Sequence, residues 1–303
     1  MANIMTKRGS LDNIVTYEHY CDTKADLANI PENEITLGST AIVLQDEDGA
    51  LGVYIATSDK EWIAMMTTGG SGGSGSDDSN SIIELIDRTI SGEVVVPNGT
   101  TNIGKYAFSG CDNVTSVVIP ESVTKIDDYA FYGNHGMKNI SIAEGVTSIG
   151  NYAFQGCSEL EEIRTPESCT IIDAENGGQN FASATSLKLA VFPNVTTIKE
   201  PHTEYGMSPE TNIFDYAGYG VTGQLKIYFP KLTKVPHKMF GGGCSAHEIY
   251  IGADCTEIAS DAFSYLLSVL NLGFAEGAVS GAPWGATKAV INYNVPMPEI
   301  ENE

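Results

Sequence analysis

The sequence has few positive charges for its length. Its 303 residues include 16 lysines and arginines against 39 aspartates and glutamates, so the net charge at pH 7 is −23. The excess is spread along the chain, because residues 1–67 hold 4 basic and 11 acidic residues while residues 68–303 hold 12 and 28. Binding to nucleic acid or to anionic lipid depends on lysine and arginine meeting phosphates. We therefore expect no nucleic acid and no membrane as a partner.

Long apolar runs and cysteine pairs at metal-binding spacing are also missing. No stretch approaches the roughly 18 to 20 apolar residues of a membrane span, and the start "MANIMTKRGSLDN" lacks the apolar centre of a signal peptide. The six cysteines include no C-x-x-C spacing that would favour a metal site. These observations predict a soluble chain made without export, and they predict no metal and no cofactor.

What the sequence does contain is a repeat. The stretches "IGKYAFSGC" (103–111), "IDDYAFYGN" (126–134) and "IGNYAFQGC" (149–157) follow one another at 23-residue steps. A fixed period in this range is typical of a solenoid, in which each coil packs on the next. Counting from Ile103, apolar residues recur at offsets 0, 5, 8, 11, 14, 16 and 20, and Cys111 and Cys157 share offset 8. Two coils would separate these sulfurs by about 10 Å, too far for a disulfide, so we expect reduced, buried thiols.

The period is interrupted and then resumes. It is lost between Ile172 and Val235, where "LAVFP" and "KIYFP" still resemble the strand "SVVIP" of the first unit. We interpret Phe181 and Phe214 as displaced repeat phenylalanines that follow insertions at 173–180 and 199–213. Each unit is predicted to hold a short helix-like "YAF" stretch, a turn and a strand, with all strands forming a parallel sheet on one side. Residues 81–90 and 282–294 are predicted to cap the two ends.

These units resemble the BspA-type leucine-rich repeats, over about residues 95–294. The resemblance rests on "VTKIDDYAFYGNHGMKNISIAEGVTSIGNYAFQGCSELEEIRTP". Proteins with such repeats occur among bacterial surface adhesins and bacteriophage virion proteins. The resemblance implies a recognition scaffold without chemistry of its own, and it does not fix a ligand.

Residues 1–67 follow a different pattern. "STAIVLQ", "ALGVYIAT" and "EWIAMM" predict a three-stranded antiparallel meander with turns rich in Asp and Gly. The segment is similar to the small amino-terminal domain of phage head fibre proteins, which implies a virion-anchoring module and a homotrimer. We thus expect a small antiparallel β domain at 1–67, a Gly/Ser-rich linker at 68–80, and a leucine-rich-repeat solenoid with caps at 81–303. The glycines of the linker at 70, 72 and 75 fit a tether better than a phosphate loop, because Asp77 and Asp78 follow and no lysine is near.

Candidate sites are few. Asp46, Asp48 and Gly49 fit a hairpin turn better than a calcium loop, and the five histidines keep no fixed spacing. No catalytic set can be identified, so we do not expect an enzyme. If offsets 14 and 16 face the core, their neighbours form an outward row on successive strands that becomes aromatic toward the carboxyl end. A single tyrosine there is more simply explained as filling an irregular gap, but the group suits sugars or a protein surface. The predicted ligand-binding residues are Glu162, Arg164, Tyr205, Tyr216, Tyr219, Tyr228 and Tyr250.

Together these features predict a bacteriophage structural protein. It would be a capsid-anchored head fibre or decoration protein, made in host cytoplasm and located in the virion. Its amino-terminal domain would bind a capsid or other virion protein, and its solenoid would bind a glycan or protein of the host surface or mucus. The alternative is a secreted or surface bacterial adhesin whose export signal is absent from this sequence. An enzyme is the third class.

Overall fold

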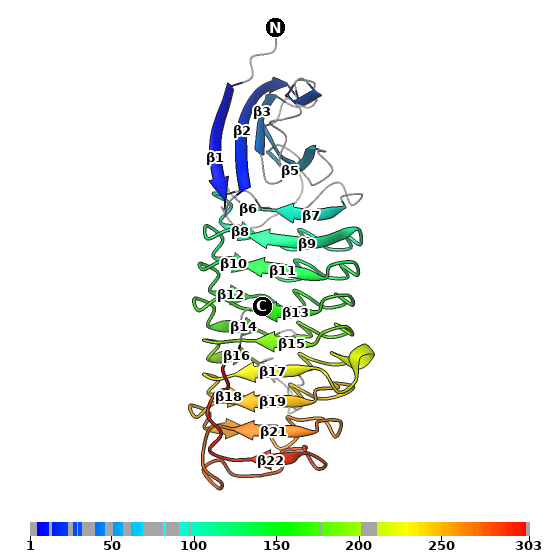
Figure 1. Ribbon diagram of the computed structural model, residues 1–303, viewed down its shortest axis with the longest axis vertical. Helices are drawn as coiled ribbons and strands as arrows, with labels where there is room; N and C mark the ends of the chain where they lie inside the picture. The colour runs from blue at the N-terminus through cyan, green and yellow to red at the C-terminus, as the bar shows by residue number, and fades with distance from the viewer. Residues whose placement is uncertain are drawn as a thin grey trace.

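The computed structural model of the protein describes residues 5–11, 14–23, 27–28, 30–31, 40–45, 51–56, 62–68, 81–82, 91–96, 98–175, 177–200 and 211–300. From residue 91 onward the described chain winds as a parallel β-solenoid (Figure 1). Each coil contributes one long strand and one short strand, so the solenoid has two stranded faces.

The long strands define what we call the long-strand face. They run in order from β7 to β22 along the solenoid axis, and contacts between β11 and β13 join its two sheets. Its members are β7 (Gly92–Val95), β9 (Val114–Ile119), β11 (Asn139–Ile142), β13 (Glu162–Arg164), β15 (Leu189–Val191), β17 (Lys226–Phe229), β19 (Glu248–Ile251), β21 (Val269–Leu272) and β22 (Val290–Asn292).

The short strands form the second face. Ile103, Ile126, Ile149, Ile172 and Ile198 pair in register from coil to coil. The strands are β6 (Ser81–Ile82), β8 (Asn102–Ile103), β10 (Lys125–Ile126), β12 (Ser148–Ile149), β14 (Ile171–Asp173), β16 (Thr197–Lys199), β18 (Lys234–Val235) and β20 (Glu257–Ile258). This face was not predicted from the sequence, because two or three residues are too few to display an alternating pattern.

The third side of each coil holds the Y-A-F-x-G turn, and we call it the turn side. The sequence predicted a helix-like stretch here, and this prediction was wrong. Tyr129 and Gly133, which flank Phe131, both have left-handed backbones, with φ of 59° and 65°. Left-handed residues cannot continue a right-handed helix. The turn instead bonds to its neighbours, since the Phe131 N–H donates to the Ala153 carbonyl at 2.8 Å.

Helix is almost absent from the described residues. The 3-10 helix η3 (Tyr219–Val221) lies in the longest coil, which spans 37 residues from Ile198 to Val235. The coil before it, from Ile172 to Ile198, spans 26 residues. Despite these extra lengths, β13, β15, β17 and β19 pair without a gap. The interpretation of "LAVFP" and "KIYFP" as strands of the array is therefore confirmed.

The core lies between these three sides. The predicted inward residues are buried in all three regular coils, except that Ile140 and Ile142 are only partly buried. The five cysteines from Cys111 onward are buried and reduced, as expected; they are Cys111, Cys157, Cys169, Cys244 and Cys255. Offset 8 also buries Asn134 between Cys111 and Cys157, and neither polar atom of the Asn134 side chain has a hydrogen-bond partner.

At the carboxyl end of the array, the predicted cap at 282–294 contains a buried tryptophan and a last strand, and its role as a cap stays a prediction. Trp284 is 1% exposed, and its carbonyl accepts a hydrogen bond from the Phe263 N–H at 3.1 Å. Strand β22 then pairs with β21. At the other end, only residues 81 and 82 of the predicted amino-terminal cap are described, and they join the short-strand face as β6.

The strands before residue 69 pair in a separate five-stranded sheet. It contains β1 (Met5–Leu11), β2 (Ile14–Thr23), β3 (Thr40–Gln45), β4 (Leu51–Ala56) and β5 (Trp62–Thr68). Strands β3, β4 and β5 pair antiparallel, but β2 and β3 run parallel, so the sheet is mixed rather than purely antiparallel. The domain boundaries at 67 and 80 stay predictions.

Candidate functional site

The outward row of the long-strand face lies where the sequence placed it. Strand pairing aligns Arg164, Val191, Tyr228 and Tyr250 in one column across β13, β15, β17 and β19. The residue that precedes each of them is fully buried on the core side. The alternation of the strands therefore turns these four side chains away from the core.

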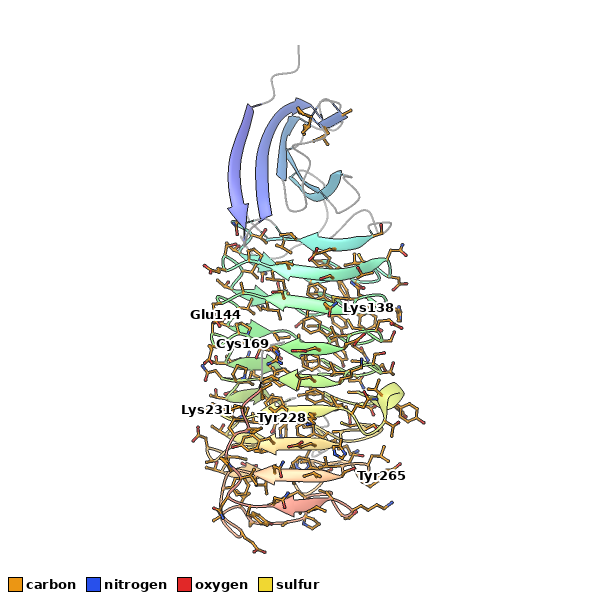
Figure 2. All side chains as sticks on the ribbon, in the orientation of Figure 1. Lys138, Glu144, Cys169, Tyr228, Lys231 and Tyr265 are labelled. Carbon is orange, nitrogen blue, oxygen red and sulfur yellow. The ribbon has the colours of Figure 1, made fainter. Side chains whose placement is uncertain are left out.

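The two tyrosines of this column are nevertheless covered. Tyr228 is only 5% exposed and Tyr250 only 4%. They form an apolar cluster with Val191, and Val295 and Ile300 pack against this cluster from the carboxyl end of the chain. We call residues 293–300 the strap and Val191, Tyr228 and Tyr250 the strip. Figure 1 shows the strap, in red, running back from β22 along the solenoid, and Figure 2 labels Tyr228 beside it.

The covered tyrosines have altered acidity. Burial raises the pKa of Tyr228 to about 12, and the nearby Glu248 carboxylate adds to the shift. Burial also raises the pKa of Tyr250, whose hydroxyl donates to the Val295 carbonyl at 3.2 Å. Both phenols therefore stay protonated, as hydrogen-bond donors, well above neutral pH.

A groove remains at the far end of the strap. It has a volume of about 380 Å³ and lies between Met297, Pro298 and Ile300 on one side and β13, β15 and the turns that follow them on the other. Arg164 lines it and is paired with Glu162, so these two predicted residues do lie together. Glu144 also lines it, and its carboxylate accepts hydrogen bonds from the Glu167 and Ser168 N–H groups at 3.0 Å each. Those bonds lower the pKa of Glu144.

The exposed aromatic residues gather elsewhere, on the turn side. Tyr216 is 51% exposed and Tyr219 60%, and their rings meet edge to face with centroids 6.1 Å apart. Tyr265, at the carboxyl end of the same side, is also exposed, and Figure 2 shows it on the opposite edge from Glu144 and Lys231. Tyr205, the remaining predicted residue, lies outside the described residues. The predicted ligand-binding residues that the structure describes are thus divided between the long-strand face and the turn side.

Sequence reasoning missed a second group of tyrosines on the turn side. Tyr106, Tyr129 and Tyr152 occupy the second position before each repeat phenylalanine, and their rings stack at 5.0 and 4.8 Å. The Lys105 ammonium lies 5.4 and 5.6 Å from the first two ring centres. Stacking covers the ring faces and leaves edges and hydroxyl groups outward. The tyrosine common to the three "YAF" turns was the signal in the sequence.

Other kinds of site find no support in the described part of the chain. No group of three or more His, Cys, Asp or Glu side chains is arranged to hold a metal there. None of its helices is long and apolar enough to cross a membrane. The calcium-like turn at 46–49 and the glycine-rich stretch at 70–75 lie outside the described residues.

The repeat geometry agrees with the sequence comparison. The pattern of the family described as "BspA type Leucine rich repeat region" matches residues 89–204 and 208–276, in six copies. The match covers more than half of the chain. This chain belongs to the BspA-type leucine-rich-repeat family. None of the curated proteins matches the sequence.

Solved structures of leucine-rich-repeat proteins are similar to this BspA-type chain. One is the leucine rich repeat protein of T. pallidum, with 20% identity, 68% of this chain and 86% of that chain covered, and a TM-score of 0.44. Another, from Eubacterium ventriosum ATCC 27560, has 21% identity, coverage of 79% and 73%, and a TM-score of 0.39. A leucine rich cell surface protein of Faecalibacterium prausnitzii A2-165 has 18% identity, coverage of 81% and 93%, and a TM-score of 0.22.

Proposed function

We propose that this BspA-type protein is a recognition protein, not an enzyme, and that its solenoid binds a glycan or protein of a host surface or mucus through the turn side. The observation that carries the proposal is the gathering of exposed tyrosines on that side. Tyr106, Tyr132, Tyr216, Tyr219 and Tyr265 are each at least 41% exposed there. Exposed rings that share one side of the solenoid offer a ligand apolar contact area at several points along it.

The arrangement suits binding more than catalysis. Backbone hydrogen bonds between coils fix Tyr106 and Tyr132, so little conformational entropy is lost when a ligand packs against them. Tyrosine offers a large apolar ring together with a hydroxyl that can pair with a sugar or a peptide group. In the edge-to-face pair, Tyr219 begins η3 and Tyr216 lies just before it, so the pair belongs to the longest coil.

The second part of the proposal concerns attachment. We place the protein in a bacteriophage virion, as a capsid-anchored head fibre or decoration protein that is attached by residues 1–67 and forms a homotrimer. The support is the resemblance of that segment to head fibre proteins and the Gly/Ser-rich composition of residues 68–80, which is typical of a linker between two modules. A bacterial surface adhesin is the second candidate, since BspA-type repeats fit that role equally well.

Two measurements test these parts separately. Mass spectrometry of purified virions should detect the protein at stoichiometric level if it is a virion component, whereas recovery only from bacterial envelope fractions would favour the adhesin. For the solenoid, we expect Tyr216→Ala with Tyr219→Ala to weaken binding to host cells or mucin by about tenfold, as truncation of aromatic contact residues does. Val290→Ala is the matched control, because Val290 is 61% exposed but lies on β22. Equal binding by both variants would contradict the turn side as the site.

A further inference from the structure

The strip and the strap form a contact that the recognition proposal does not use. The outward tyrosines of the strip form an aromatic surface. The strap packs against this surface. The strap runs from Tyr293 to Ile300, with the sequence YNVPMPEI. Its contacts indicate which chemistry the strip accepts.

The strap lies on the strip as an extended chain that is not a strand. Pro296 and Pro298 have no N–H to donate, and the residues before them are forced toward extended backbone. Its backbone bonds are made where it leaves the solenoid, from the Asn294 N–H to the Phe274 carbonyl at 3.0 Å and from the Val295 N–H to the Leu272 carbonyl at 2.9 Å. On the strip itself, the Tyr250 hydroxyl donates to the Val295 carbonyl. Aromatic surfaces with hydroxyl donors are a common way to bind proline-rich peptides.

The strap fits the strip incompletely. Residues 296–299 are all exposed, and of the segment's apolar side chains Val295 and Ile300 are the two that pack against the strip. Between them, Met297 and Pro298 border the groove of about 380 Å³. The strap thus leaves space unfilled beside Met297 and Pro298, where a better-fitting segment would gain contacts that the strap does not make.

We propose that the strip is a docking surface for an extended, proline-containing apolar peptide segment of a partner protein, and that the strap is a built-in competitor for that surface. The inference concerns a different face from the turn side and does not depend on the proposed function. A tethered competitor acts at an effective concentration of about millimolar. In the intact chain the strap therefore occupies the strip most of the time, and a free peptide binds weakly. Weakening the strap should therefore increase the affinity for a peptide added in solution.

The experiment uses the full chain and a fluorescein-labelled peptide with the sequence YNVPMPEIENE. We expect Val295→Asp to bind this peptide about tenfold or more tightly than the unsubstituted chain, because the charge expels the competitor from the apolar strip. Ile300→Asp, at the other end of the strap, should act in the same direction. Val290→Asp is the matched control and should leave peptide binding unchanged. A peptide with alanine in place of both prolines should bind more weakly to the Val295→Asp chain.

The outcomes separate the possible occupants. Tighter binding that also falls when Tyr250→Phe is added to Val295→Asp supports the proposal, since that change removes the hydroxyl donor and keeps the ring. No binding to either strap variant, with thermal melting unchanged, would overturn it. A concentration-dependent dimer of the unsubstituted chain that is lost in Val295→Asp would assign the strip to a second copy instead. Binding that persists with the proline-free peptide at equal strength would refute the requirement for proline.

Discussion

Phe154 stacks on Phe181, with ring centroids 5.5 Å apart and ring planes 7° from parallel, at the point where the 23-residue interval is first broken. The next contact, Phe181 on Phe214, has a centroid distance of 5.3 Å across a still longer interval. These three rings belong to one column of stacked phenylalanines that continues from coil to coil. Its members are Phe108, Phe131, Phe154, Phe181, Phe214, Phe240 and Phe263.

Removing a ring from this column should damage more than one coil. Phe131 is fully buried and stacks on Phe108 at 5.0 Å and on Phe154 at 5.1 Å. We expect Phe131→Ala to lower the free energy of unfolding by about 3 to 5 kcal/mol. Because repeats are stabilised by their neighbours, hydrogen exchange should accelerate in the adjacent coils as well. Tyr132→Ala, one residue on and 41% exposed, is the control and should change both quantities little.

The column explains how much of the fold the sequence could predict. A period of 23 places equivalent residues above one another, so the core positions of the regular coils follow from three aligned repeats. Phe181 and Phe214 were correctly interpreted as displaced members because a buried ring is needed in every coil. The path of the chain between these two phenylalanines could not be predicted from the sequence, because the inserted residues have no repeat pattern.

The candidate site was less predictable for a physical reason. Strand alternation correctly turned Tyr228 and Tyr250 outward, but facing outward is not the same as being exposed. Their cover comes from residues 293–300, which lie beyond the last repeat and carry no periodic signal. The left-handed backbone of Tyr129 was equally invisible in the sequence, because tyrosine seldom adopts it. Ligand binding by the predicted residues stays a prediction.

A buried asparagine offers a stabilising substitution. Asn134 occupies the position that holds cysteine in the coils on either side, and its side-chain amide has no hydrogen-bond partner. Burying an unpaired polar group costs about 1 to 3 kcal/mol, so Asn134→Cys should raise the free energy of unfolding by a similar amount. Urea denaturation would measure it. A loss of stability would mean that Asn134 is satisfied by a buried water that the substitution removes.

The buried thiols should be chemically silent in the native protein. Burial raises the pKa of Cys169 and Cys244 to about 12 and that of Cys255 to about 11, and it raises the pKa of Cys157 further. Since the thiolate is the reactive form, these four should resist a thiol reagent near neutral pH. After denaturation without a reductant, all six cysteines should react. A lower count that recovers when reductant is added would reveal a disulfide.

Alkaline pH should report on the strap. Because Tyr228 ionises near pH 12 in the folded protein but near its ordinary value of 10 when unfolded, the unfolded state binds fewer protons between these values. Its contribution to stability is therefore complete below pH 10 and is lost as pH rises toward 12, and the buried thiols act with the same sign. Absorbance titration should find a late-ionising phenol. Val295→Asp should lower the pKa of Tyr228 toward its ordinary value. An unchanged titration would mean that the strap does not shield the Tyr228 ring from water.

The changing length of the coils has a consequence for how such a chain can diversify. Coils of 23, 26 and 37 residues sit in one stack because their strands pair in succession whatever lies between them. The extra residues between strands therefore leave the strand pairing along the stack intact. We therefore expect changes of length between β16 and β17 to cost the stack little stability. We expect the same interval to accept a grafted loop, because added residues there would leave the strand pairing, and with it the distance between the two ends of the solenoid, unchanged.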